Sequence, residues 1–319
     1  MAVGGDQGGS IRMPASYSGI YGMKPTHGLV PYTGIMPIEI YIDHTGPMTA
    51  NVSDNALMLE VMAGSDGIDP RQFDVETHPY SELLEGGVSG MKIAVVKEGF
   101  GHPNSESDVD AANRAAAQIF KKLGAEVSEV SIPMHLVGGA LWTPIGVEGL
   151  TGTMMWGDGY GHSRQDLYVT SLMDFHHRWR DRADQMSETT KLLTMLGTYI
   201  RKQYGLRYYG KGVNLSRKLA AAYDKVLGEV DLLLMPTLPL KATPLPGPDA
   251  SREEYVQRAL EMLTNTASFD ITHHPAMSIP CGMGEGLPIG MMLVGKRYDE
   301  ATIYKAAYAF EQAEDWKTL

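Results

Sequence analysis

The stretch GGDQGGSIRMPA at residues 4–15 places a serine, Ser10, directly after two glycines, Gly8 and Gly9. Glycine can adopt backbone conformations that other residues avoid, so consecutive N–H groups can point into one concavity. Such a nest stabilises the oxyanion that forms when a hydroxyl attacks a carbonyl carbon. A serine at the end of such a nest could therefore act as the nucleophile of acyl transfer, but Gly-Gly-Ser by itself favours a solvated glycine turn.

The elements around this segment indicate an α/β protein. Residues 1–50 are dense in glycine and proline, which excludes long helices and predicts turns between short strands. A buried strand at 91–96, an amphipathic helix within 107–127 that ends at Gly124, and a strand at 126–132 form a strand–helix–strand unit. That order is typical of an α/β architecture.

The remaining elements are read from the same periodicities. We expect helices at 49–64, 252–265 and 299–316, a Pro-rich loop at 237–250, and strands at 231–236, 275–282 and 287–295. In the first of these helices, Ser53 is the expected N-cap and Gly64 the stop. Residues 134–228 are rich in helical patterns, and we interpret them as an insertion that could cap the sheet within one domain, 1–319.

Composition narrows the possible partners. The chain has 319 residues and a formal net charge of −11, which argues against nucleic acid or an anionic membrane surface as a partner. The single cysteine, Cys281, cannot form an internal disulfide, which fits a reducing compartment. The start of the chain lacks the pattern of a signal peptide, and no run of eighteen apolar residues occurs, so we expect a cytoplasmic protein without a membrane span.

Histidine and cysteine spacing does not suggest a metal site. No CxxC pair or His/Cys cluster has zinc spacing. The adjacent pairs His176-His177 and His273-His274 are expected to be surface or loop residues, because sequence neighbours do not face one metal on a helix or strand. We therefore expect no metal and no cofactor.

The longer string at residues 4–34 resembles the signature of the amidase signature family, the serine hydrolases with a Ser–Ser–Lys triad. The pattern runs G-x-D-x-G-G-S-I-R-x-P-A and continues as G-x-x-G-x-K-P-T-x-G-x-V-P. The matching positions are Gly5, Asp6, Gly8, Gly9, Ser10, Ile11, Arg12, Pro14, Ala15, Gly19, Gly22, Lys24, Pro25, Thr26, Gly28, Val30 and Pro31. The likeness continues at 43–64, 230–239 and 275–295, and the version YIDHTGPM looks most like amidases associated with nitrile metabolism.

The resemblance implies roles for the residues of the opening segment. Ser10 matches the nucleophile, and the backbone N–H groups of Gln7, Gly8, Gly9 and Ser10 match the oxyanion hole. Two further positions, Asp6 and Arg12, match residues that brace this loop, and the KPT lysine, Lys24, matches a structural position and not the catalytic base. The implied reaction is hydrolysis of a small-molecule carboxylic amide to the acid and ammonia, without a cofactor, by a mixed-sheet protein that could form a homodimer.

The departures from the family pattern matter for activity. The family's catalytic lysine and bridging serine lie upstream of the nucleophile, whereas residues 1–9 contain neither residue type. We therefore expect an N-terminally truncated fold with little activity alone. We also expect apolar runs left exposed at 92–96, 232–236 and 288–295. Asp270 and His273 stand where N-x-x-G is frequent, and we expect them to tune packing and the acyl pocket.

Two other functions remain open at this point. The same signature occurs in amidotransferase subunits that deliver ammonia to a partner, so an amidase-like subunit, or a fragment completed by another chain, is the alternative. Co-purification with a second polypeptide would favour it. An unrelated serine esterase is disfavoured because the sequence lacks a G-x-S-x-G elbow.

Overall fold

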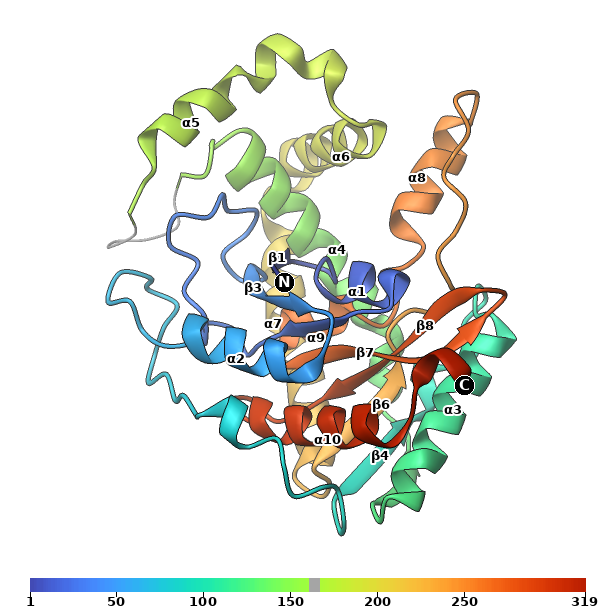
Figure 1. Ribbon diagram of the computed structural model, residues 1–319. Coiled ribbons are helices and arrows are strands. Elements are labelled where there is room, and N and C mark those ends of the chain that lie inside the picture. Colours follow the sequence, from blue (N-terminus) through green and yellow to red (C-terminus); the bar gives the residue numbers. More distant parts are fainter. Residues whose placement is uncertain (161–166) are drawn as a thin grey trace.

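The computed structural model describes residues 1–160 and 167–319, which form a mixed sheet of eight strands in the order β1-β3-β2-β7-β8-β6-β4-β5 (Figure 1). The strands are β1 (Ala2–Asp6), β2 (Tyr21–Lys24), β3 (His44–Thr49), β4 (Lys92–Val96), β5 (Glu126–Val130), β6 (Leu232–Pro236), β7 (Ala276–Gly284) and β8 (Leu287–Val294). Strand β4 pairs in parallel with β5 and β6, and the other pairs are antiparallel. The predicted α/β class with a mixed sheet is confirmed.

Helices cover both faces of the sheet, and alternating strand residues point into each layer. On one face, residues of α2 (Val52–Met62), α3 (Ser107–Lys122) and α10 (Glu300–Ala313) share a hydrophobic core with Ile93 and Val95 of β4. On the other face, residues of α4 (Gly138–Gly149), α7 (Arg207–Leu227) and α9 (Ala267–Thr272) share a second core with Ala94 and Val96. The predicted strand–helix–strand unit is present as β4, α3 and β5, with its two strands parallel.

Three apolar runs expected to be exposed are buried. Residues 93–96, all of β6 and residues 289–294 belong to the interior of the protein. The reason is their place in the sheet, because β8 lies between β7 and β6 and each of these strands is covered by helices on both faces. The prediction that these runs would be exposed is wrong.

The helix-rich part of the chain also contains α5 (Thr170–His177) and α6 (Glu188–Tyr204), followed after β6 by α8 (Arg252–Leu260). Figure 1 shows α5 and α6 on the far side of α4 from the sheet. In the described part of the chain, no helix is long and apolar enough to cross a membrane.

Two short helices and one cap differ from the predictions. Helix α1 (Arg12–Ser18) follows the glycine loop and ends at Gly19, whose φ of 63° is the left-handed conformation typical of a helix terminus. Neither α1 nor α9 was predicted. The N-cap of α2 is Asn51, whose side chain accepts a hydrogen bond of 2.7 Å from the Asp54 N–H, and not Ser53.

Candidate active site

The glycine loop between β1 and α1 is fixed through its carbonyl groups. Donors from three different segments reach three successive carbonyls. The Gln7 carbonyl accepts from Trp142 Nε1 at 2.6 Å, the Gly8 carbonyl from Thr266 Oγ1 at 2.5 Å, and the Gly9 carbonyl from the Met13 N–H at 2.7 Å. The loop is therefore held from α4, from the turn before α9, and from its own helix α1.

These anchors determine where the loop's N–H groups point. In a trans peptide the N–H points opposite to the carbonyl of the same unit, and the described residues contain no cis peptide bond. The N–H groups of Gly8, Gly9 and Ser10 therefore point away from the three anchoring donors. Within the described part of the chain, no backbone carbonyl or side chain accepts from these three N–H groups. They are free to bind an anionic oxygen next to Ser10.

Close packing explains why glycine occupies both loop positions. Gly9 has a φ of 140°, and a Cβ at this position would overlap the Thr266 hydroxyl. A Cβ on Gly8 would lie 3.0 Å from Cζ2 of Trp142 and 3.1 Å from Cδ2 of Leu263. The loop backbone thus lies directly against the residues that anchor it.

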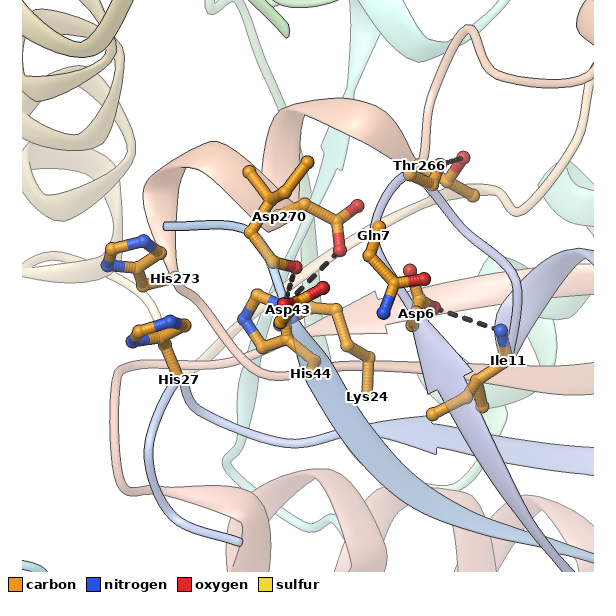
Figure 2. Close-up of polar contacts among 12 residues, drawn as sticks. Asp6, Gln7, Ile11, Lys24, His27, Asp43, His44, Thr266, Asp270 and His273 are labelled. Carbon is orange, nitrogen blue, oxygen red and sulfur yellow. Dashed lines mark hydrogen bonds and ion pairs between the residues drawn. The ribbon is translucent and has the colours of Figure 1, made fainter. Parts of the chain in front are cut away.

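Ser10 lies at the turn into α1 with its side chain exposed. Its hydroxyl has no hydrogen-bond partner among the described residues. The following N–H, of Ile11, donates to Asp6 Oδ2 at 3.2 Å, which ties the turn back to the end of β1 (Figure 2).

Behind the loop lies a buried ionic network. Arg12 donates to both carboxylate oxygens of Asp6, at 3.0 and 3.1 Å, and to Asp270 Oδ2 at 2.8 Å, and all three side chains are fully buried. Burial alone would raise the pKa of Asp6, but the Arg12 guanidinium, together with the hydrogen bond to Asp270 and the charge of Lys24, lowers it. Burial, together with the charge of Asp6, raises the pKa of Asp270 well above its usual range. Asp6 and Arg12, the two residues expected to brace the loop, contact each other, whereas the part taken by Asp270 was not predicted.

Lys24 lies in this buried network and is not hydrogen-bonded to the Ser10 hydroxyl. Its Nζ donates to the Pro25 carbonyl at 2.9 Å, and the side chain is fully buried. Burial lowers the pKa of Lys24 to about 7, although the neighbouring Asp270 opposes this shift. Figure 2 shows Lys24 among the acidic side chains of the network.

Beside the network, three imidazoles bind three consecutive carbonyls of one segment. His27 Nε2 bonds the Ile40 carbonyl at 3.0 Å, His273 Nε2 the Tyr41 carbonyl at 2.8 Å, and His44 Nδ1 the Ile42 carbonyl at 2.8 Å. The rings of His27 and His273 stack with centroids 4.3 Å apart (Figure 2). Burial lowers the pKa of His273 to about 3 and those of His27 and His44 well below their usual range. All three imidazoles are therefore neutral donors at neutral pH.

His273 and His274 lie in the loop between α9 and β7 and His177 is exposed, as expected, but the two loop histidines are not solvent-exposed. His274 is fully buried and bonds Asp224 at 3.0 Å, and His273 is largely enclosed, because this segment passes from α9 into the interior strand β7. His176 and His177 both reach the carboxylate of Asp158, at 3.1 and 2.7 Å. Across residues 1–160 and 167–319, no three His, Cys, Asp or Glu side chains are arranged to hold a metal ion.

A pocket of about 430 Å³ opens beside the glycine loop. Its walls are mostly apolar, and its lining consists of His102, His135, Leu136, Gly139, Trp142, Thr143, Val147, Leu192, Leu193, Leu196, Leu260, Leu263 and Thr264. Burial lowers the pKa of His135 to about 4, so this ring is neutral at neutral pH. No Asp, Glu, Lys or Arg belongs to the described lining. Trp142 and Leu263 are the wall residues that also contact Gly8.

Comparison with known proteins gives consistent matches. The family model described as Amidase matches residues 1–304. An enantioselective amidase from Rhodococcus rhodochrous is 45% identical over 315 residues, covering 98% of this chain and 60% of that protein. A glutamyl-tRNA(Gln) amidotransferase subunit from Lysinibacillus sphaericus is 38% identical, covering 99% of this chain and 63% of that protein. The chain thus spans about three fifths of the length of these curated relatives.

The solved structures that superpose on this chain also include an amidotransferase subunit and an amidase. A glutamyl-tRNA(Gln) amidotransferase subunit from Thermotoga maritima superposes with a TM-score of 0.77 at 28% identity, covering 98% of this chain and 62% of the other. A bacterial aryl acylamidase of the amidase signature family superposes with a TM-score of 0.71 at 27% identity, covering 99% of this chain and 62% of the other.

Proposed function

Because the chain belongs to the amidase family, we propose that it carries the nucleophile and the oxyanion-binding loop of an enzyme that hydrolyses carboxylic amides to the acid and ammonia. The observation that carries this proposal is the loop itself. Three N–H groups that have no acceptor among the described residues follow one another beside an exposed serine hydroxyl, and the carbonyls of the same peptide units are fixed on the opposite side. This arrangement suits the transition state of acyl transfer, in which the carbonyl oxygen becomes negative.

The proposed reaction assigns a role to each part of the loop. The Ser10 hydroxyl attacks the amide carbonyl carbon while the carbonyl oxygen is bound by the N–H groups of Gly8, Gly9 and Ser10; Gln7 stays a further predicted donor. Collapse of the tetrahedral intermediate releases ammonia, and water then hydrolyses the acyl-enzyme. Asp6 and Arg12 hold the loop without touching the substrate.

A serine needs a base to become nucleophilic. The resemblance implies a neutral lysine that takes the Ser10 proton through a second serine. Among the described residues no lysine bonds the Ser10 hydroxyl, and Lys24 is bonded to Pro25 inside the ionic network. The proposed enzyme therefore needs polypeptide that supplies the lysine and the second serine, in the same chain or from a partner.

The pocket favours an apolar acyl group over glutamine. A glutamine substrate would bring a carboxylate and an ammonium group, and burying either without a charged partner is costly. The described pocket lining offers leucines, a tryptophan and neutral polar groups but no charged side chain. For this reason we propose a stand-alone amidase. An amidotransferase component, supported by 38% identity to one such protein, is the second candidate.

We also propose a cellular location and an oligomeric state for this enzyme. We place the enzyme in the cytoplasm because its single cysteine, Cys281, is unpaired and buried. A homodimer is the proposed assembly.

Hydrolysis of two amides tests this function. The chain is joined to the portion of the Rhodococcus rhodochrous amidase that it does not match, and release of ammonia from phenylacetamide and from glutamine is measured. We expect phenylacetamide to be hydrolysed at least about tenfold more efficiently than glutamine, and Ser10→Ala to abolish both activities. Preferential hydrolysis of glutamine would favour the amidotransferase component instead.

A further inference from the structure

Trp142 of α4 contacts two parts of the site at once. Its ring forms part of the apolar pocket wall, and its Nε1 donates to the Gln7 carbonyl at 2.6 Å. The same ring comes within 3.0 Å of where a Gly8 Cβ would lie. One rigid, planar side chain therefore touches both the proposed acyl pocket and the proposed oxyanion loop.

Thr266 and Trp142, the two anchors that come from outside the loop and α1, have different surroundings. Thr266 is fully buried in the turn that leads into α9, so the Gly8 carbonyl is attached to a fixed point of the fold. Trp142 is half-buried and faces a pocket of about 430 Å³ that no described side chain fills. The Gln7 carbonyl is thus attached to a ring that has room to move on its pocket side.

When the Trp142 ring moves, the geometry of the peptide unit makes the Gly8 N–H move with it. The Gln7 carbonyl and the Gly8 N–H belong to one planar unit and cannot turn independently. A group that fills the pocket presses on the indole ring, which carries its N–H with it as a rigid body. The orientation of the Gly8 N–H then depends on whether the pocket is filled.

From this geometry we infer that Trp142 is a positioning residue that couples occupancy of the apolar pocket to the orientation of the Gly8 amide, while the Gly9 amide stays fixed by Thr266. The inference rests on the proposed function of the same site. A substrate with a bulky apolar acyl group should therefore have a higher kcat as well as tighter binding. Its contact with the ring orients a hydrogen-bond donor that acts on the transition state. A small acyl group such as acetyl would bind without this contact.

The coupling can be measured without any hydrolysis. The full chain is labelled with 15N-glycine and titrated with phenylacetamide, and with acetamide as the small comparison ligand, while the Gly8 and Gly9 amide resonances are followed. We expect phenylacetamide, but not acetamide at the same concentration, to shift the Gly8 resonance more than the Gly9 resonance, because only the Gly8 N–H shares a peptide unit with the carbonyl that Trp142 binds. In Trp142→Phe, which keeps a ring in the pocket but lacks the indole N–H, phenylacetamide should bind within about threefold of the original affinity and leave the Gly8 resonance unmoved.

Two further variants make the readout specific. Trp156→Phe is the matched control, because the Trp156 indole donates to Thr198 at 3.0 Å outside this pocket. It should respond to phenylacetamide as the original chain does. Thr266→Ser retains the hydroxyl that anchors Gly8 and should also retain the response.

The outcomes separate the inference from the proposed function. If phenylacetamide does not bind, if it leaves the Gly8 resonance of the original chain in place, or if it shifts this resonance equally in Trp142→Phe, the coupling is overturned. These results do not depend on Ser10 chemistry. A failure of the proposed function would appear instead as intact glycine responses in a protein whose Ser10 never forms an acyl-enzyme.

Discussion

At the scale of single residues, the candidate site depends on peptide units whose orientation is fixed by side chains far away in sequence. Trp142 and Thr266 lie 135 and 258 positions from the carbonyls they bind. A nest of N–H groups is usually attributed to the glycines that form it. In this protein the glycines permit the conformation, and the distant donors select it.

Gly9→Ala tests how closely the loop fits its surroundings. Gly34→Ala is the matched control, because Gly34 also has a positive φ, of 80°, but open space around it. We expect Gly34→Ala to lower the free energy of unfolding by about 1–2 kcal/mol through backbone strain alone. Gly9→Ala adds overlap with Thr266 and should cost about 1–3 kcal/mol more. Equal losses in urea unfolding would show that the loop is not packed as described.

His273 makes a prediction about acid stability. Its pKa is lowered to about 3 in the folded protein by burial, whereas an unfolded histidine has a pKa near 6.5. Below pH 6.5 the unfolded chain therefore binds protons that the folded chain does not, so stability falls as the pH falls. Between pH 7 and 5 this single group should account for about 2 kcal/mol of that loss.

His273→Gly isolates this contribution. Glycine also suits the backbone at this position, where φ is 68°. The free energy of unfolding, measured by urea titration at pH 7, 6 and 5, should fall with acid by about 2 kcal/mol less in the variant than in the original chain. An unchanged slope would mean that the imidazole is not held neutral in the folded state.

At the scale of elements, segments with a clear apolar pattern could be predicted from the sequence. Very short helices and contacts between distant segments could not. Strand β4 is a short apolar run and helix α3 carries a full apolar period, so both elements could be predicted from the pattern, whereas the burial of β4 within the sheet could not. Helices α1 and α9 have seven and six residues, too few to show a period, and α1 follows a glycine-rich stretch.

The same limit applies to the site. Ser10 and its glycines could be identified because they are neighbours in sequence. The bond from Arg12 to Asp270 spans 258 positions, and no local pattern indicates that α9 brings this carboxylate to the loop. Trp142 and the pocket were missed for the same reason, since the wall is assembled from separate helices. One signal was available, because Asp270 and His273 stand where other residues are frequent in the family.

Helix α6 carries an exposed apolar stripe, formed by Leu192, Met195, Leu196 and Tyr199 at helical spacing, with side chains 38 to 63% exposed. Exposed apolar stripes of this kind favour association. We expect the chain to self-associate at micromolar concentration, and Met195→Glu with Tyr199→Glu to shift it toward the monomer. Sedimentation velocity measures the change, with Leu245→Glu, an exposed residue outside α6, as the control. A chain that stays monomeric, or associates equally in the double variant, would contradict this prediction.

At the scale of the whole molecule, the chain carries the proposed nucleophile and the proposed oxyanion donors, but the described residues give Ser10 no base. Loss of triad members in serine hydrolases typically costs on the order of 10⁴- to 10⁶-fold in rate. We therefore expect the purified chain to hydrolyse acetamide or benzamide negligibly. A turnover near one per second that disappears in Ser10→Ala would refute this and would make Lys24 the first candidate for a substitute base.

The central claim, that Ser10 is the nucleophile of this site, is tested most directly by covalent labelling. The chain is supplied with the portion of its amidase relative that it does not match, fused or as a separate peptide, and treated with a fluorophosphonate probe. Mass spectrometry should find one adduct, on Ser10, which rises from neutral to alkaline pH as the supplied lysine loses its proton. Ser10→Ala should abolish the adduct, and Lys24→Met should leave it within a few-fold. An adduct on another serine, or a site silenced by Lys24→Met alone, would contradict the account.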